Sequence, residues 1–328
     1  MILPEFLKFS QTLGDDFDLV QGAGGNTSIK TDNSLFVKAS GFQLSEALKK
    51  DIFTEVALGG NPLSPAFKSL DGKRPSIETS FHMLMPQKVV VHVHSVHIIA
   101  LSTLIEAADV FGEMLADMDW TLVGYARPGL PLATAIANTI KGGAAPEVVI
   151  LANHGLIVAG ATISEVAQKI EEIKHRASRV TRQSLALSNE EDAKRAVTDA
   201  AALAPKGYGV AKSKYAHIAA RDEHSFMFAT GGSLYPDHVV FLGRGAVGVP
   251  RAGRLPEKPV SKLLLMQSVG AFLENDGSET AQDMAGAMGR IVSLIPIDAR
   301  VNYLTADQET ELMNWEAEKF RTALAKAH

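Results

Sequence analysis

The chain has 328 residues, of which 32 are Lys or Arg and 37 are Asp or Glu, so its formal net charge at pH 7 is 32 − 37 = −5. Apolar residues make up 46% of the chain and charged residues 21%, which excludes global disorder because this much apolar surface can form a core. The mildly acidic balance gives no electrostatic reason to expect nucleic acid or a membrane surface as a partner.

Cysteine is absent from the sequence, which excludes disulfides, thiolate metal sites and a cysteine nucleophile. Any metal ion must therefore bind to His, Asp or Glu. The first residues lack the pattern of a signal peptide, and no apolar run reaches the ~20 residues that span a bilayer. We therefore expect a cytoplasmic protein.

Turn residues and short β-rich runs fill the first part of the chain. The pattern predicts a short helix over residues 5–13 and strands over residues 18–21, 27–30 and 35–38. Glycine and Asp-Asn pairs separate these runs, which is typical of tight turns.

The middle of the chain alternates between helices and strands. The pattern predicts a helix over 76–85 that begins after Pro75, strands over 88–95 and 147–151, and a long helix over 164–187. Residues 162–165 have the spacing of a capping box. The long helix has one apolar stripe, formed by Val166, Ile170, Ile173, Ala177 and Val180.

A break in the pattern at residues 204–207 (APKG) places a domain boundary near residue 204. Beyond it the pattern predicts strands at 226–228 and within 263–272, and a last helix over about 307–325. That helix is expected to bury Met313, Ala317, Phe320 and Leu324. Alternating elements favour an α/β architecture, with a domain over 1–203 and a smaller α/β domain over 204–328.

The segment VHVH at residues 91–94 carries the clearest chemical signal. Alternate side chains on a strand point to one face, so His92 and His94 lie side by side and offer half of a Zn²⁺ site. His154, which ends a second buried strand before Gly155, is the best candidate for a third ligand. The alternative is that the three histidines are structural.

Glu78 lies 92 − 78 = 14 positions before His92, which leaves room for one helix and a returning strand. A carboxylate beside a divalent ion can bind the ion or act as a general base. The alternative is an ordinary solvated residue of a helix.

The glycine-rich segment at residues 22–27 (GAGGNT) does not form a dinucleotide fingerprint, because Thr27 stands in place of the last glycine and a strand follows. Its backbone N–H groups can bind an anion, or the segment can be a plain hairpin turn. The sequence leaves both open.

Five segments resemble the class II aldolase/adducin family and occur in the order of that family. They are GGNTS at 24–28, KASG at 38–41, RPSIE at 74–78, VHVHS at 91–95 and NHGL at 153–156. The resemblance covers about residues 5–185. It implies a three-layer α/β/α domain with a mainly antiparallel central sheet, Zn²⁺ or another divalent cation as cofactor, and a homo-oligomer, usually a tetramer.

The resemblance also implies roles for individual residues. His92, His94 and His154 match the metal-binding histidines, Glu78 matches the catalytic carboxylate, and Tyr125 falls where fuculose-phosphate aldolases carry a tyrosine that can act as an acid. Four further residues fall where these aldolases hold the substrate phosphate, namely Asn26, Ser40, Gly41 and Ser76.

One departure from the family pattern concerns phosphate. Ile77 stands where the sugar-phosphate aldolases often have a second hydroxyl group, which removes one hydrogen-bond donor. The chain is therefore expected either to bind a phosphorylated substrate modestly or to use Lys73 or Arg74 as the partner of an unphosphorylated acid.

The function that the resemblance implies is reversible aldol cleavage of a ketose phosphate, or of a related sugar or keto acid, through a metal-bound enediolate. A sugar-phosphate epimerase and a keto-acid decarboxylase are close alternatives, and a non-catalytic module like adducin is a more distant one. A dehydrogenase would need a dinucleotide fingerprint, which the sequence lacks. Residues 235–239 (YPDHV) resemble the region that follows the aldolase half in longer two-domain relatives.

Overall fold

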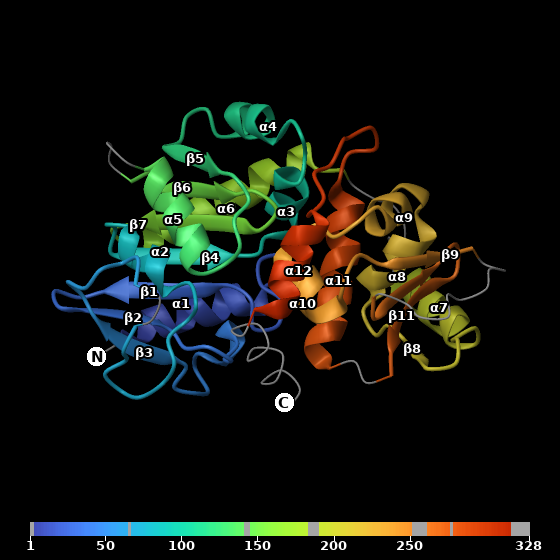
Figure 1. Ribbon diagram of the computed structural model, residues 1–328, viewed down its shortest axis with the longest axis horizontal. Helices are drawn as coiled ribbons and strands as arrows, with labels where there is room; N and C mark the ends of the chain where they lie inside the picture. The colour runs from blue at the N-terminus through green and yellow to red at the C-terminus, as the bar shows by residue number, and fades with distance from the viewer. Residues whose placement is uncertain are drawn as a thin grey trace. The chain divides into compact units, whose positions relative to one another are not determined.

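The computed structural model describes residues 3–64, 67–140, 145–182, 190–250, 261–275 and 278–315. The chain divides into two compact units (Figure 1): unit 1 is Met1–Ile98 with Glu106–Ala177, and unit 2 is Ile99–Ile105 with Ser178–His328. This division lies earlier in the chain than residue 204, and the assignment of domains to 1–203 and 204–328 stays a proposal.

Unit 1 is built on a seven-stranded sheet in the order β3-β2-β1-β4-β7-β6-β5. All neighbouring strands are antiparallel except β5 and β6, so the sheet is mixed. The strands are β1 (Asn26–Lys30), β2 (Ser34–Lys38), β3 (Phe53–Ala57), β4 (Val89–Val93), β5 (Trp120–Val123), β6 (Val148–Leu151) and β7 (Gly155–Gly160).

Helices and one 3₁₀ turn pack around this sheet. They are α1 (Pro4–Asp15), η1 (Leu44–Glu46), α2 (Thr79–Leu84), α3 (Val96–Ser102), α4 (Ala107–Met114), α5 (Leu130–Thr139) and α6 (Ile163–Val180). Phe81 of α2 and Ile136 of α5 share one buried apolar cluster with Val90, Val149 and Ile157 of the sheet. This cluster fixes α2 against β4, the strand that carries His92.

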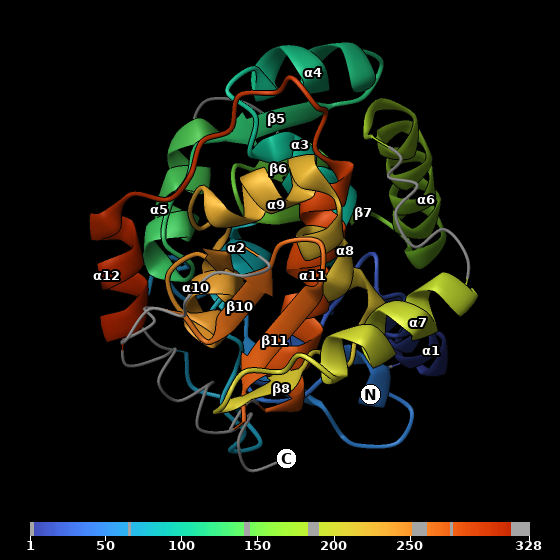
Figure 2. The same ribbon diagram turned by 90° about the vertical axis from the view of Figure 1, so that its right-hand side faces the viewer.

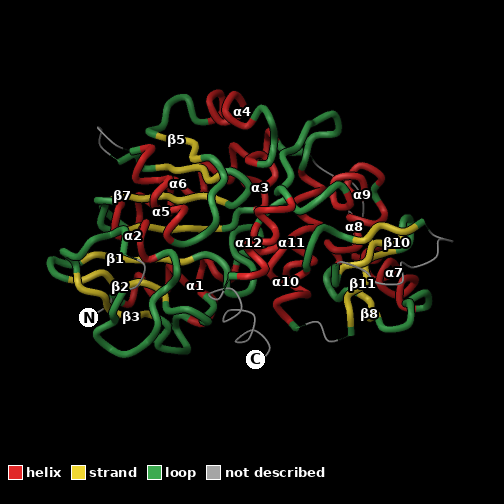
Figure 3. Tube along the Cα trace, viewed as in Figure 1, coloured by secondary structure: helices red, strands yellow, loops and turns green. Residues whose placement is uncertain are grey.

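Unit 2 has its own sheet of four strands in the order β8-β11-β10-β9, drawn in yellow in Figure 3. The strands are β8 (Tyr208–Val210), β9 (Val247–Val249), β10 (Leu263–Met266) and β11 (Gly270–Glu274). The helices are α7 (Glu190–Ala201), α8 (Lys214–Arg221), α9 (Glu223–Thr230), α10 (Pro236–Leu242), α11 (Glu279–Leu294) and α12 (Ala306–Asn314). Helix α11 packs against α8, α9 and α10 (Figure 2).

Two predicted strands are wrong. Residues 18–21 form a turn after α1, because the backbone N–H groups of Leu19 and Val20 both donate to the carbonyl of Asp16. Residues 226–228 lie in α9, where the Asp222 side chain caps the helix by accepting a hydrogen bond from the backbone of Ser225. In both places a local hydrogen bond overrides strand propensity.

Several predicted elements have different bounds. The strand predicted over 88–95 ends at Val93, so His94 lies beyond it. The helix predicted from residue 76 begins at Thr79, because the Ser76 backbone N–H donates to the carbonyl of Lys38 and the chain still pairs with β2 there. The predicted strand within 263–272 is a hairpin of β10 and β11, with Ser268 at a positive φ of 61° in its turn. The long helix α6 ends at Val180, which is exposed instead of buried.

The last predicted helix is only partly described. Helix α12 covers Ala306–Asn314 and buries Leu312, while Met313 is exposed, contrary to the prediction. Ala317, Phe320 and Leu324 lie outside the described residues. Within the described part of the chain, no helix has both the length and the apolar character needed to cross a bilayer.

Candidate metal centre and active site

The predicted histidines come from two neighbouring strands of unit 1. His92 lies in β4, His94 follows the end of that strand, and His154 lies in the turn between β6 and β7. Strand β7 pairs with β4, so the β6–β7 turn comes next to the end of β4. Gly155 is required there, since a Cβ at this position would lie 2.4 Å from the carbonyl oxygen of Val93.

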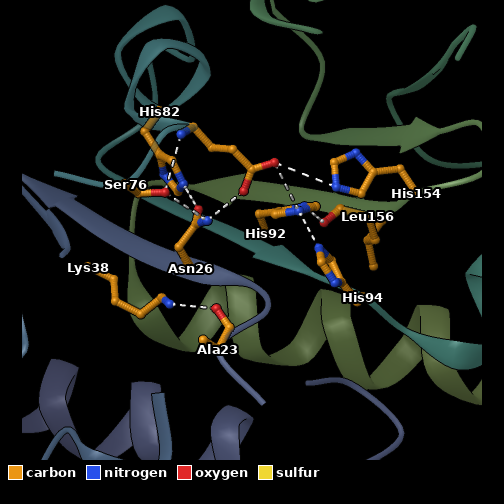
Figure 4. A network of polar contacts seen from close by, with 10 residues as sticks. Ala23, Asn26, Lys38, Ser76, His82, His92, His94, His154 and Leu156 are labelled. Atoms are coloured by element: carbon orange, nitrogen blue, oxygen red, sulfur yellow. Dashed lines mark hydrogen bonds and ion pairs between the residues drawn. The ribbon is translucent and has the colours of Figure 1, made fainter. Parts of the chain in front are cut away.

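The three imidazole rings converge on one point (Figure 4). One ring nitrogen from each histidine lies within 4.8 Å of the others, and the Nε2 atoms of His92 and His94 are 3.1 Å apart. All three side chains are buried. Gly24 leaves room for the His94 ring, because a Cβ at this glycine would lie 2.9 Å from Nδ1 of His94.

The proton on His92 follows from its hydrogen bond. Its Nδ1 lies 3.1 Å from the carbonyl oxygen of Leu156, which can only accept, so Nδ1 carries the proton and the lone pair of Nε2 faces the other rings. Three buried nitrogen ligands at this spacing are the donor set that a divalent ion such as Zn²⁺ takes, with a fourth position left for water or substrate. The residues therefore fit a metal ion.

Glu78 is the residue next to this cluster. Its Oε1 atom lies 3.6 Å from Nε2 of His92 and 3.6 Å from Nε2 of His154, and its Oε2 accepts a hydrogen bond of 2.8 Å from the amide of Asn26. Burial raises the pKa of the Glu78 carboxyl, but the charges of the three histidines and the Asn26 hydrogen bond outweigh it and set the pKa to about 2. The carboxylate is therefore ionised at neutral pH.

The residues expected at the phosphate lie around the start of β1 and the end of β2. The amide of Asn26 is 3.4 Å from Oγ of Ser76, and Ser40 donates both its backbone N–H, to Arg74, and its hydroxyl, to Pro75. Gly41 has a φ of 90°, a conformation that favours glycine. The structure thus places Ser40 and Ser76 on adjoining segments, with Asn26 next to Ser76.

Tyr125 is placed by the parallel pairing of β5 with β6. Val123 pairs with Leu151, so the two strands end at the same edge of the sheet. Tyr125 follows β5 by two residues and His154 follows β6 by three, which brings both into the loops at this edge. The Tyr125 side chain is half-buried.

Lys73, the expected partner of an unphosphorylated acid, is already paired. Its ammonium group forms ion pairs with Asp51 at 2.5 Å and Asp71 at 3.1 Å. Its positive charge is therefore balanced within the 51–73 region.

Two polar residues of the site are missed by sequence reasoning. His82 of α2 is fully buried between Ser28 and Asn26, and burial together with the charge of His92 lowers its pKa well below the ordinary value. Lys38 is also buried, and its ammonium group donates to the carbonyl of Ala23 at 2.9 Å (Figure 4). It also donates to the carbonyl of Phe42 at 2.8 Å. Lys38 thus joins the glycine-rich loop to the loop that carries Ser40 and Gly41.

Each missed residue has a sequence signal. His82 follows Glu78 by four positions, which places the two on the same side of a helical turn. Lys38 is a lysine at the end of an apolar strand, where a buried charge requires hydrogen-bond partners.

Comparisons with known proteins agree on one family. The family model described as "Class II Aldolase and Adducin N-terminal domain" matches residues 5–180. The chain is similar to an L-fuculose phosphate aldolase of Methanococcus maripaludis, with 30% identity over 52% of this chain and 91% of that protein. It is also similar to a 3-oxo-tetronate 4-phosphate decarboxylase of Haemophilus influenzae, with 30% identity over 48% of this chain and 76% of that protein.

Two further similarities cover the same part of the chain. An uncharacterized oxidoreductase of Bacillus subtilis, YuxG, is 30% identical over 50% of this chain, and the match spans 27% of that protein's length. Among solved structures, the N-terminal class II aldolase domain of a conserved protein from Thermoplasma acidophilum matches with 27% identity and a TM-score of 0.47. That match covers 55% of this chain and 93% of the other.

Proposed function

The chain belongs to the class II aldolase and adducin N-terminal domain family, and from this premise we propose that it is a metal-dependent carbon–carbon lyase. The proposed reaction is the reversible aldol cleavage of a ketose phosphate or of a related sugar or keto acid. The observation that carries the proposal is the buried cluster of His92, His94 and His154 with the ionised Glu78 carboxylate 3.6 Å from two of its rings.

The proposed ligands are the three histidines, and Zn²⁺ is the proposed ion. When bound there, a divalent ion would polarise substrate oxygen atoms and stabilise the negative charge that develops as the bond breaks. Nδ1 of His92, by donating to the carbonyl of Leu156, keeps the Nε2 lone pair turned toward this position.

Glu78 is the proposed base and acid. Its Oε1 faces the histidine cluster, while its Oε2 is held by the amide of Asn26. In the direction of aldol addition, Oε1 would take a proton from the carbon next to the substrate carbonyl, which gives the enediolate. In the direction of cleavage it would return a proton to that carbon. Tyr125 is proposed to move the proton of the departing oxygen.

The proposed phosphate donors are Ser40, Gly41 and Ser76, with Asn26 as a fourth member that also holds Glu78. Ser40 and Ser76 lie on segments that the pairing of residues 74–76 with the end of β2 brings together. Their hydroxyl and backbone groups would bind an anion by directed hydrogen bonds.

A keto-acid decarboxylase is the second candidate. It is supported by the 30% identity to a protein named as a 3-oxo-tetronate 4-phosphate decarboxylase. Both reactions pass through an enediolate, so the same histidines and the same carboxylate would serve either one. An epimerase is a third use of this intermediate.

A non-catalytic module like adducin is disfavoured. A buried carboxylate and three buried imidazoles cost free energy unless they meet a partner of opposite charge. A module with no chemistry to perform gains nothing from such a cluster.

Further parts of the proposal concern the whole protein. We expect a three-layer α/β/α catalytic domain over 1–203, a smaller α/β domain over 204–328, a homo-oligomer that is a tetramer by family resemblance, and a cytoplasmic location. The proposed partners are small sugar phosphates or keto acids, without nucleic acid or membrane.

The test is a screen of the zinc-loaded protein with ketose 1-phosphates and free keto acids. Release of an aldehyde that depends on the ion supports the lyase. Release of carbon dioxide without an aldehyde identifies the decarboxylase. Neither product, from a protein that binds zinc at the histidines, contradicts both.

A further inference from the structure

The ring of His82 lies between two residues of β1 and is hydrogen-bonded on both sides. Its Nδ1 is 2.7 Å from the hydroxyl of Ser28. Its Nε2 bonds to Oδ1 of Asn26 (Figure 4). Ser28 and His82 are fully buried, so no water competes for either bond. A buried imidazole with two partners is held in one orientation.

The directions of the hydrogen bonds that link Ser28, His82, Asn26 and Glu78 follow from the bond between Asn26 and Glu78. The NH₂ group of Asn26 donates to Oε2 of Glu78 at 2.8 Å. The second amide proton points to Oγ of Ser76 at 3.4 Å. The carbonyl oxygen of Asn26 therefore faces His82.

The same reasoning fixes the proton on His82. The carbonyl oxygen of Asn26 only accepts, so Nε2 of His82 carries the proton and donates it. Nδ1 is then an acceptor, and the Ser28 hydroxyl donates to it. All bonds from Ser28 through His82 and Asn26 to Glu78 thus point the same way.

The hydrogen bond from Asn26 to Glu78 decides which carboxylate oxygen of Glu78 faces the histidine cluster. With Oε2 held by Asn26, the other oxygen, Oε1, faces His92 and His154 at 3.6 Å from each Nε2. If the amide of Asn26 turned over, its carbonyl oxygen would meet Oε2 and repel the carboxylate. A donor at the position of Nε2 of His82 also opposes this rotation, because the turned amide would bring its NH₂ group against that donor.

We propose that His82 is a positioning residue for Glu78: through Asn26 it fixes the carboxylate oxygen that faces the histidine cluster. The inference rests on the proposed function for its kinetic test but not for its spectroscopic one. His82 is not proposed to bind the metal ion or the substrate, so its effect on the reaction passes through Glu78.

The kinetic test uses two substitutions of the same side chain. His82→Phe keeps a ring but removes both hydrogen bonds, and we expect kcat to fall by about 10- to 100-fold, the scale of a misplaced catalytic group. Zinc content should stay within about twofold, because the three histidines do not change. KM should change less than kcat, because only one of the four proposed phosphate donors, Asn26, loses a hydrogen-bond partner. His82→Gln keeps an N–H donor of similar reach and should recover most of kcat.

A matched control is His217→Gln in unit 2. His217 is also a fully buried histidine with hydrogen bonds on both ring nitrogens, to the carbonyl of Ala211 and from the N–H of Ala271. We expect it to leave kcat unchanged. A fall in kcat as large as that of His82→Phe would mean that any lost buried imidazole slows the enzyme, and would overturn the proposal.

A double-mutant cycle separates positioning from structure. If His82 acts through Glu78, then His82→Phe has no further effect on kcat in a Glu78→Gln background. Equal fold-changes in both backgrounds would overturn the proposal, because the two residues would then act independently.

The spectroscopic test needs no substrate. In metal-free protein with ¹⁵N-labelled histidine, His82 should show the tautomer with the proton on Nε2. In His82→Phe the side-chain amide signals of ¹⁵N-labelled Asn26 should shift or broaden. The Nδ1–H tautomer, or unchanged Asn26 signals, would overturn the inference. If no substrate is turned over but both signatures appear, the proposed function fails and the link from His82 to Glu78 stands.

Discussion

The two units of the chain arrange their partly or fully buried ionisable groups in opposite ways. In unit 2, both oxygens of Asp222 accept hydrogen bonds from Arg182, at 2.6 and 2.8 Å, and one also accepts from the backbone and hydroxyl of Ser225. In unit 1, three imidazoles and a carboxylate converge, and the Nε2 atoms of His92 and His94 lie 3.1 Å apart. The Asp222–Arg182 ion pair is matched within the chain and stabilises the fold. The converging ring nitrogens of the three histidines are instead arranged in a way that suits a bound cation.

The comparison suggests different roles for the two networks, structural for the first and, as proposed above, functional for the second. Both oxygens of Asp222 accept hydrogen bonds from within the chain, so this network needs no ligand. The histidine cluster is complementary to a positive ion instead. We therefore expect changes in unit 1 to act on metal content and turnover, and changes in unit 2 to act on stability.

The largest effect should come from His94→Ala. It removes one of three proposed ligands, and we expect turnover to fall below detection and zinc no longer to raise the melting temperature. A fluorescence melting curve with and without zinc measures the second effect, which follows from linkage between binding and folding. Full activity in this variant would contradict the expectation that changes at the unit 1 histidines act on metal binding and turnover.

Glu78→Gln should reduce kcat by about 10²-fold or more, because it removes the group proposed to move the proton. Zinc content should stay close to that of the wild type, since the three histidines are untouched. Steady-state kinetics with metal analysis of the same sample checks both. Unchanged kcat would show that the carboxylate has no part in the chemistry.

Asp222→Asn tests whether the Asp222–Arg182 ion pair of unit 2 acts on stability and not on metal content. Burial raises the pKa of Asp222, but the hydrogen bonds from Arg182 and Ser225 outweigh it and hold the pKa at about 2. We expect the substitution to lower the free energy of unfolding at pH 7 by about 1–3 kcal/mol, with zinc content unchanged. Urea unfolding measures this difference.

The pH dependence of that difference follows from the sign of the shift. A carboxyl whose pKa is lower in the folded chain contributes stability in full above its unfolded pKa, and loses it as the pH falls through the folded value. The gap between wild type and Asp222→Asn should therefore be constant near neutral pH and shrink between about pH 4 and pH 2. A gap that widens toward pH 2 would contradict the assigned cause.

The smallest effect concerns the anion donors. Ile77→Ser restores the hydroxyl that the family pattern leads us to expect next to Ser76 and Glu78. One charge-assisted hydrogen bond contributes roughly 1.5–3 kcal/mol, so inorganic phosphate should compete with substrate at about tenfold lower concentration or better. If the inhibition constant for phosphate is the same in Ile77→Ser and in the wild type, the anion does not bind next to residue 77.

The histidine cluster could be predicted because its causes are local. The alternation of the predicted strand pairs His92 with His94, although β4 ends at Val93, and a strand end followed by Gly155 indicates a turn. The missed residues depend on contacts between distant segments: His82 meets Asn26 from 56 positions away, and Lys38 meets the glycine-rich loop from 15. The local signals single out His82 and Lys38 as residues, but they do not give these partners.

The errors in the fold have two origins. Residues 226–228 have strand propensity, but the local cap at Asp222 starts a helix there. The segment before Thr79 has helical propensity, but the pairing of its backbone with the end of β2 delays the helix. That delay places Glu78 at the N-cap of α2, next to the amide of Asn26. A local hydrogen bond therefore decided the first case, and a tertiary contact decided the second.

The most direct measurement of the central claim is the zinc content of the purified chain after dialysis against zinc. Mass spectrometry of the metal should give about one ion per chain in the wild type and in Glu78→Gln, and a small fraction of that in His154→Ala. Equal zinc content in wild type and His154→Ala would contradict the assignment of His92, His94 and His154 as the metal centre.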